Sequence, residues 1–443
     1  DYILTYNKKE ENGSISRAFA LEIINDITID NKNFQESIEN IIKKKPFSSA
    51  DKRDISLGRL IALTTLRRYN VIELILEKYI KKSIKTHSHS VHNILCISLC
   101  QILYLNTPAY AVVNIAIGLT KNQNKGKFLK NLVNAILRRI SLEKELLIKE
   151  YNNPVLILPK WIKKRWLLQY GEVLLKQICS AQIIEPPLDL TVKENPIEWA
   201  KKLNGTVTKS GSVRLQNFSY IPDIEGYDTG DWWVQDAAAT IPVKILGDIK
   251  NKNIIDICSA PGGKTAGLIN NGAIVTALDI NKDRIKILNE NLKRLKFTAT
   301  IICNDGLTFK PKNLADVILL DPPCTSTGVI RRHPDILHRV NIKNLEYCMN
   351  VQKNLLKSSI KMLKDGGIII YCTCSLETEE GEEQIDKFIS KNKNVRRRKI
   401  DPIHLDGFNT SLTPKGDIRI LPNMLENGGN DGFFISMIEK IDA

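Results

Sequence analysis

The sequence predicts a multidomain protein built from an all-α bundle, a small α/β connecting domain and an α/β domain of the Rossmann-like type. A chain of 443 residues is too long for one ordinary hydrophobic core. Helical periodicity dominates its first third, whereas apolar runs alternate with helical segments in its last part. These patterns place the three domains at residues 1–145, 146–235 and 236–443.

The first domain is predicted to be helical because apolar residues recur every three or four positions, as at Ile15, Phe19 and Ile23. Asp51 is placed to cap one later helix and Asn70 to cap the next, since short polar side chains bind the free N–H groups at helix starts. We therefore expect a compact bundle of roughly seven helices joined by short loops.

An uncharged stretch runs through the middle of this domain. Residues 88–120 contain no Lys, Arg, Asp or Glu, which suits either a transmembrane span or buried helices. Asn106, Thr107 and Pro108 interrupt the stretch, and each remaining piece is too short to cross roughly 30 Å of hydrocarbon. Two buried helices are the favoured interpretation. No secretory pattern opens the chain, so we expect a soluble, cytoplasmic protein with no membrane partner.

The connecting domain is predicted from a mixed pattern punctuated by prolines. A helix is expected at 161–178, and strands are expected near 188–192 and 212–215.

The last domain is predicted from apolar runs that are separated by helical segments, a pattern typical of a parallel sheet covered on both faces. The expected strands are 254–257, 273–280, 300–303, 317–320 and 368–372. A helix at 345–363 is expected to stop at Gly366 and Gly367. Segments 417–421 and 433–437 are expected to close the sheet as a hairpin-like pair.

Charge and cysteine content narrow the function classes. The net charge is +15, and residues 1–150 hold 24 Lys and Arg against 15 Asp and Glu. Such an excess favours a polyanionic partner, most simply nucleic acid, although solvated lysine-rich faces would also give it. The nine cysteines form no C-x-x-C pair, and no cysteine or carboxylate clusters with His87, His89 and His92. Neither disulfides nor a metal site is expected.

A glycine-containing loop, Cys258–Lys264, follows the first strand of the last domain. It is not a phosphate-binding Walker loop, because Cys258 stands where a glycine is needed, and Lys264 occupies the middle slot of a dinucleotide fingerprint. A tight turn that a ligand can approach closely remains. Asp279 ends the next strand and can accept from both hydroxyls of a ribose, and Asp305 follows the third strand and can accept from an adenine amino group. A ribose and a base without a phosphate cradle indicate S-adenosylmethionine.

Two cysteines follow later strands: Cys324 in Asp-Pro-Pro-Cys and Cys374 in Thr-Cys-Ser. Thiols beside a methyl donor suit methylation of cytosine at C5, because a thiolate that adds to C6 places electron density on C5. Lys264 could help to form the thiolate, and Asp321 could accept a hydrogen bond from the cytosine amino group. An adenine amino-methyltransferase also carries Asp-Pro-Pro, but with an aromatic residue where Cys324 stands.

Several segments make the sequence similar to a known family. Residues 256–265, 320–328 and 371–375 resemble the RNA 5-methylcytosine methyltransferases of the Nol1/Nop2/Sun family, as do residues 329–336 and 431–434. The first domain resembles the antitermination factor NusB. The resemblance implies that Cys374 is the nucleophile and that Cys324 helps to release the product. It also implies that S-adenosylmethionine is held by Cys258, Ser259, Ala260, Pro261, Gly262, Gly263, Lys264, Asp279, Asp305 and Asp321.

The function expected on this basis is transfer of a methyl group from S-adenosylmethionine to C5 of one cytidine in 16S ribosomal RNA, through a covalent cysteine–C6 adduct. Thr325 follows Cys324, whereas DNA cytosine enzymes typically have Gln there. The substrate could be naked RNA or an early small-subunit particle, and a monomer is expected. Two alternatives stay open: the same chemistry on transfer RNA, and a non-catalytic RNA-binding or ribosome assembly factor.

Two further segments are candidates for RNA contact. Residues 331–333, Arg-Arg-His, could position an RNA phosphate or a flipped base, with a structural loop as the alternative. Trp232 and Trp233 could stack on bases, with packing between domains as the alternative.

Overall fold

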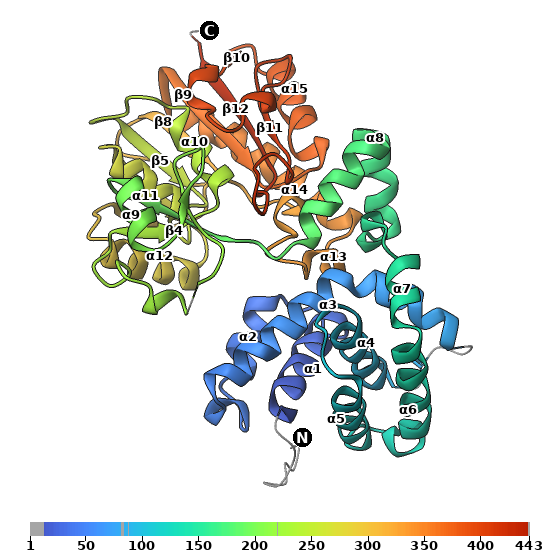
Figure 1. The fold of residues 1–443 in the computed structure, drawn as a ribbon. Coiled ribbons are helices and arrows are strands. Elements are labelled where there is room, and N and C mark those ends of the chain that lie inside the picture. Colours follow the sequence, from blue (N-terminus) through green and yellow to red (C-terminus); the bar gives the residue numbers. More distant parts are fainter. Residues whose placement is uncertain (1–12, 81–83, 87, 219, 442–443) are drawn as a thin grey trace. The chain divides into compact units, whose positions relative to one another are not determined.

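The computed structural model describes residues 13–80, 84–86, 88–218 and 220–441, which form two compact units. The first unit comprises the described residues up to Ile183 together with Arg332–Val340, and the second comprises Ile184–Arg331 and the described residues from Asn341 onward. The first unit is therefore built from two separate segments of the sequence. The colours of Figure 1 show this, since the orange helix α13 (Ile336–Arg339) belongs to that unit. The domain boundaries expected at residues 145 and 235 stay a prediction.

The first unit is helical, as the apolar periodicity predicted. Its longer helices are α1 (Ser14–Thr28), α2 (Phe34–Ile41), α3 (Lys52–Tyr79), α4 (His89–Tyr104), α5 (Ala109–Lys121), α6 (Gly126–Leu142), α7 (Lys144–Glu150) and α8 (Lys160–Ile183). The uncharged stretch forms α4 and α5, and almost all of α4 is buried. The Asp51 side chain caps α3 by accepting from the Arg53 N–H at 2.7 Å. None of the helices in the described ranges is long and apolar enough to cross a bilayer.

The helix break predicted at Asn70 is wrong. Helix α3 continues through this residue, with Leu66 and Ile72 buried on either side of it. The Asn70 amide donates instead to the Ile157 carbonyl at 2.7 Å. A tertiary partner for the amide and an unbroken apolar face outweigh the capping tendency of asparagine.

The second unit is built on an eight-stranded sheet with the order β10-β12-β9-β8-β5-β6-β7, and β11 pairs with β12. Strands β5 to β9 are parallel, whereas β10, β11 and β12 run antiparallel to their partners. The bounds are β5 (Asn253–Ile257), β6 (Ile274–Asp279), β7 (Thr300–Cys303), β8 (Ala315–Leu320), β9 (Leu363–Thr373), β10 (Val395–Arg398), β11 (Ile418–Ile420) and β12 (Phe433–Lys440). The Rossmann-like parallel sheet is therefore confirmed.

Helices cover both faces of this sheet. On one face, Ile255 and Ile257 of β5 pack with α14 (Ile342–Met362) and α15 (Glu382–Lys391). On the other face, Ile254 packs with α10 (Ile241–Lys244) and α11 (Gly263–Asn270), and α12 (Lys282–Arg294) lies against β6 and β7. The alternation within β5 is the two-residue period of a strand buried on both sides.

The helix predicted at 345–363 ends within one residue of the expected position, but the role given to the two glycines as its stop signal is wrong. Helix α14 ends at Met362, and Gly366 and Gly367 lie inside β9, which begins at Leu363. Gly366 has φ +73° with open space around it, so the two glycines form an irregular strand start and not a helix stop.

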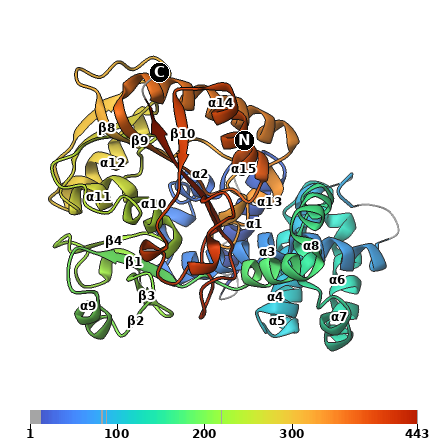
Figure 2. The same cartoon turned by 90° about the horizontal axis from the view of Figure 1, so that it is seen from above.

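A smaller antiparallel sheet, in the order β2-β3-β1-β4, precedes the large one. Its strands are β1 (Leu188–Val192), β2 (Thr206–Val207), β3 (Val213–Leu215) and β4 (Trp232–Val234), and α9 (Pro196–Lys202) packs against β2 and β3 (Figure 2). Trp232 and Trp233 of β4 are 0% and 4% exposed. They are core residues, so the suggestion that they stack on bases is wrong.

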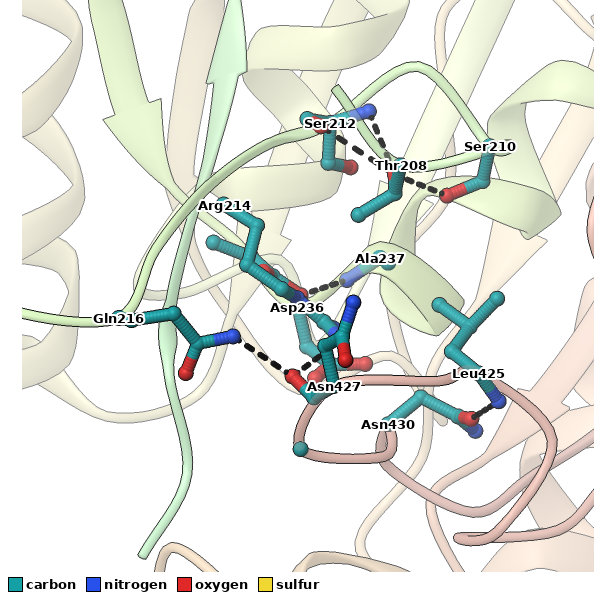
Figure 3. Close-up of polar contacts among 12 residues, drawn as sticks. Thr208, Ser210, Ser212, Arg214, Gln216, Asp236, Ala237, Leu425, Asn427 and Asn430 are labelled. Atoms are coloured by element: carbon teal, nitrogen blue, oxygen red, sulfur yellow. Dashed lines mark hydrogen bonds and ion pairs between the residues drawn. The ribbon is translucent and has the colours of Figure 1, made fainter. Parts of the chain in front are cut away.

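A buried arginine and a nearby glutamine connect this small sheet to the loop before β12. Arg214 forms a two-fold ion pair with Asp189, at 2.7 and 2.8 Å, and donates to the Glu426 carbonyl at 3.0 Å. Figure 3 shows Gln216 beside it, donating to the Asn427 carbonyl, at 2.9 Å. The loop is thereby held by side chains more than 200 positions away in the sequence.

Candidate functional site

The glycine loop joins β5 to α11 at the carboxyl edge of the sheet. Cys258 has φ +63° and Gly262 has φ +106°. A side chain at Gly262 would meet the Leu288 Cδ1 atom at 2.5 Å, so both the backbone angle and the space require glycine there. Ser259 extends the pairing with β6 by donating its N–H to the Leu278 carbonyl at 3.1 Å.

Two of the predicted aspartates lie at the ends of the neighbouring strands. Asp279 ends β6, is 2% exposed, and accepts from the Ala260 N–H of the glycine loop at 3.3 Å. Arg284 pairs with the same carboxylate at 3.3 Å. Asp305, after β7, is half-buried and accepts from the Leu307 N–H at 2.9 Å. Adjacent parallel strands thus bring the two carboxylates to the edge that carries the glycine loop.

These residues fit S-adenosylmethionine. The aspartate carboxylates accept hydrogen bonds, as ribose hydroxyls and an amino group require, and would repel a phosphate. The Ser259 hydroxyl is buried and has no hydrogen-bond partner among the described residues, so a donor and acceptor remains for a ligand. Ser259 and the two carboxylates would hold the cofactor at this edge.

Lys264 and Asp321 form an ion pair across the edge, with 2.6 Å between Nζ and Oδ2. Lys264 is the second residue of α11, and Asp321 directly follows β8. Burial opposes the lysine charge, but the Asp321 carboxylate and the neighbouring thiols Cys372 and Cys374 together raise the pKa of Lys264. The lysine therefore carries a positive charge inside the site at any physiological pH.

The two predicted thiols meet at the same edge. The Sγ atoms of Cys324 and Cys374 are 3.5 Å apart, and the Ser326 hydroxyl lies 3.6 Å from the first and 3.5 Å from the second. The hydrogen bond from Cys324 lowers the pKa of Cys374, against the effect of burial. The same contact, together with burial, raises the pKa of Cys324 well above its usual value. Of the two thiols, Cys374 is therefore the more readily deprotonated.

Arg331, offered above as an RNA contact, is buried. It is 1% exposed, pairs with Asp236 and Asp431, and donates to the Gly428 carbonyl at 2.7 Å. It closes the loop before β12 and is not available to a phosphate. Arg332 and His333 belong to the helical first unit.

Sequence reasoning missed a buried glutamate beside the thiols. Glu380, after β9, accepts from the Thr325 N–H at 3.0 Å, and Gln352 of α14 donates to it at 2.9 Å. Glu380 is one of five glutamates between residues 377 and 383, and no spacing rule separates a buried member of such a run from an exposed one. Its position six residues after Cys374 is the only signal in the sequence.

The histidine segment also differs from expectation. His87 lies outside the described residues, but His92 pairs with Glu73, and Cys96 lies near the same carboxylate. The ligand atoms of Glu73, His92 and Cys96 are within 4.8 Å of one another. The expectation that no carboxylate or cysteine gathers at these histidines is wrong, because α3 supplies the glutamate. Lys85 also pairs with Glu73, at 2.6 Å, so the charge of this carboxylate is already compensated within the protein.

Comparison with known proteins places the chain in a family. Residues 243–439 match the family described as 16S rRNA methyltransferase RsmB/F, and residues 14–142 match the NusB family. The ribosomal RNA small subunit methyltransferase B of Pasteurella multocida (strain Pm70) is 32% identical over 409 residues, covering 88% of this chain and 89% of the relative. The protein of the same name from Proteus mirabilis (strain HI4320) is 31% identical, covering 91% and 94%.

Solved structures share the fold. The crystal structure of PH0851 superposes with a TM-score of 0.76 at 20% identity and covers 98% of this chain and 100% of that one. A methyltransferase homolog protein from Pyrococcus horikoshii gives a TM-score of 0.53 at 26% identity, covering 64% and 95%.

The fold and the edge residues define an S-adenosylmethionine-dependent methyltransferase. Because the similarity to curated relatives extends over nearly the whole chain, the protein belongs to the ribosomal RNA small subunit methyltransferase B family.

Proposed function

We propose that this protein transfers a methyl group from S-adenosylmethionine to C5 of a cytidine in 16S ribosomal RNA. The observation that carries the proposal is the pair of thiols 3.5 Å apart at the cofactor edge, one with a lowered and one with a raised pKa. The names of the curated relatives support ribosomal RNA as the substrate, and the net charge of +15 suits a polyanion.

The proposed role of Cys374 is to add to C6 of the target cytosine. A bond forms between Sγ and C6, and the electron pair of the C5–C6 double bond moves onto the ring, which makes C5 nucleophilic. S-adenosylmethionine, when bound, supplies an electrophilic methyl group. Transfer leaves S-adenosylhomocysteine; C5 then gives its proton to water, the C5–C6 double bond re-forms from that C–H electron pair, and the Sγ–C6 bond breaks to release Cys374 as thiolate.

Cys324 is proposed to assist that last stage. The contact between the two sulfurs lowers the pKa of Cys374 in the free protein, so Cys324 is proposed to favour the Cys374 thiolate before substrate binds. Once Cys374 is bonded to carbon, Cys324 lies next to the same ring and can help to expel it.

The Lys264–Asp321 pair is proposed to serve both the thiolate and the base. The Lys264 charge favours the Cys374 thiolate, and the half-exposed Asp321 carboxylate can accept a hydrogen bond from the cytosine amino group. Assigning Asp321 to the base leaves Ser259, Asp279 and Asp305 to hold the cofactor.

Substitution of each cysteine tests the proposal. Cys374→Ala should abolish methyl transfer to 16S RNA, measured with a labelled methyl group, while calorimetry still detects S-adenosylmethionine binding. Cys324→Ala should accumulate a protein–RNA adduct that survives denaturing electrophoresis. Cys303→Ser, which alters an exposed cysteine, is the control and should behave as wild type. The roles are reversed if Cys324→Ala prevents the adduct and Cys374→Ala traps it.

The nature of the RNA is tested separately. Bisulfite sequencing of ribosomal and transfer RNA from cells lacking the protein should show one cytidine losing its methyl group in 16S RNA. A loss confined to transfer RNA, or no loss at all, would contradict the proposed substrate.

A further inference from the structure

The two thiols are carried by loops from different strands. Cys324 lies four residues beyond the end of β8, and Cys374 directly follows β9. The pairing of β8 with β9 ends at Leu320 and Tyr371, so the strand ladder does not by itself hold the Cys324 loop in place. A sulfur separation of 3.5 Å therefore depends on contacts between the loops.

Glu380 makes such contacts with the Cys324 loop. Thr325, the residue after Cys324, donates its N–H to Oε1 at 3.0 Å and its hydroxyl to Oε2. Gln352 donates to Glu380 at 2.9 Å and also to the Pro323 carbonyl at 2.9 Å. Glu380 and Gln352 thus hold the residues on both sides of Cys324.

The same network reaches the Cys374 loop. The Thr325 hydroxyl lies 3.0 Å from the hydroxyl of Ser375, the residue after Cys374. The Glu380 carbonyl accepts from the Tyr371 hydroxyl at 2.8 Å, which ties the glutamate to β9 itself. Glu380, through its side chain and its carbonyl, and Thr325 therefore connect both loops.

Burying a carboxylate costs free energy unless hydrogen bonds compensate for the lost water. Glu380 is 0% exposed, and burial raises its pKa, against the bonds from Ser375 and Thr325. Removing the acceptor would leave the Thr325 N–H buried without a partner, a stronger perturbation than losing a solvent-exposed bond.

We infer that Glu380 is a positioning residue that sets the separation of Cys324 and Cys374, with Thr325 as the link to both loops. Its consequence for catalysis rests on the proposed function, but the separation itself exists in the free protein and can be measured without RNA.

The test measures how readily the two thiols pair in the full-length protein. In a series of glutathione redox buffers, oxidised glutathione accepts two electrons and leaves as two thiols while Cys324 and Cys374 form a disulfide. Alkylation of the remaining thiols and peptide mass spectrometry then give the fraction of protein with this disulfide in each buffer. That fraction gives the effective concentration of the Cys324 thiol at Cys374. Glu380→Gln, which puts an amide donor against the donors of Thr325 or Gln352, should lower this value about tenfold.

A matched set of variants separates positioning from general damage. Glu383→Gln, which alters a half-exposed glutamate three residues away, should match wild type. Thr325→Val should lower the effective concentration, whereas Thr325→Ser, which keeps the hydroxyl, should restore it. If Glu380→Gln does not fold, the two Thr325 variants carry the test. The inference is wrong if Glu380→Gln and Thr325→Val both pair their thiols as wild type does.

A second measurement distinguishes this inference from the proposed function. RNA with 5-fluorocytidine at the target should form a stable adduct about ten times more slowly with Thr325→Val than with wild type, at unchanged S-adenosylmethionine affinity. Failure of wild type itself to form the adduct would overturn the cysteine chemistry, while the redox measurement would still decide the role of Glu380.

Discussion

Asp256 is a carboxyl group near the end of β5 that the fold keeps away from water. It is 1% exposed, its Oδ2 accepts from the Thr265 hydroxyl at 2.6 Å, and its Oδ1 has no partner among the described residues. Burial raises the pKa of Asp256 to about 7. The native protein therefore keeps this proton over a pH range in which the unfolded chain releases it.

The sign of the resulting pH dependence follows from that difference. Between about pH 4 and 7 the folded state binds the Asp256 proton and the unfolded state does not. The contribution of Asp256 to the free energy of unfolding therefore falls by about 1.4 kcal/mol for each unit that the pH rises. Asp256→Asn removes this fall. The free energy of unfolding of the variant, relative to that of wild type, should therefore rise with pH across this interval and stay constant above it. Urea unfolding at pH 5, 6, 7 and 8 measures it, with exposed Asp228→Asn as the control. If the free energy of unfolding changes with pH by the same amount in Asp256→Asn and in wild type, this expectation is wrong.

Individual site residues differed in how far the sequence could predict them. Cys324, Cys374, Asp279 and Asp305 were predicted to share one edge, and they do, because the carboxyl ends of parallel strands converge whatever the details of packing. Glu380 could not be predicted, since its burial depends on side chains from α14 and on the Cys324 loop. Arg331 was misjudged for the same reason: its partners lie about 100 residues away on either side.

At the scale of elements, three backbone segments come together at Gly328. Gly328 donates its N–H to the Cys374 carbonyl at 2.9 Å and accepts from the Gly432 N–H at 2.8 Å. A Cβ at Gly328 would lie 2.2 Å from the Gly432 oxygen and 2.9 Å from the Cys374 oxygen. Three chain segments therefore meet at a point that has no room for a side chain.

Gly328→Ala should separate these segments. We expect it to destabilise the protein by about 1–3 kcal/mol in urea unfolding and to slow adduct formation, because the Cys374 backbone must move. Gly118→Ala, in helix α5 with open space around it, is the control and should be neutral or stabilising by about 1 kcal/mol or less. An unperturbed adduct rate in Gly328→Ala would show that the contact does not position Cys374.

Long apolar elements were predictable, and short or conflicting ones were not. The five parallel strands and the buried pair α4 and α5 follow from patterns that hold over many residues. The small strands β2 and β10 carry too few residues for a pattern, and Asn70 offered a local helix-start signal that tertiary packing overrode. Local chemistry decides an element only where tertiary contacts do not oppose it.

At the scale of the whole molecule, the first unit contains a segment from late in the chain. The Asp335 carboxylate accepts from the Phe34 N–H at 3.3 Å, His338 donates to the Leu66 carbonyl at 3.0 Å, and the His338 ring meets the Tyr69 ring at 4.9 Å. Ile336 and Leu337 of this segment are 6% and 5% exposed. Sequence patterns predicted the helical unit but not this addition, which depends on contacts across about 300 residues.

Removal of residues 1–183 should therefore leave an exposed apolar segment. We expect the remaining chain to aggregate, or to bind a hydrophobic dye, in size-exclusion and fluorescence measurements. Replacing Ile336 with Ser and Leu337 with Gln in the shortened chain should restore a monodisperse sample. A shortened chain that stays monodisperse without these replacements would contradict the expectation.

The segment Arg332–Val340 also limits how such a protein can evolve by recombination. Because the polypeptide passes between its two units at residues 183–184, 331–332 and 340–341, a single genetic crossover cannot exchange one unit whole. A foreign helical half would arrive without the nine residues that complete it. Helical halves from other lineages are therefore compatible only if those nine residues are inherited with them, so the two separated stretches should diverge in step.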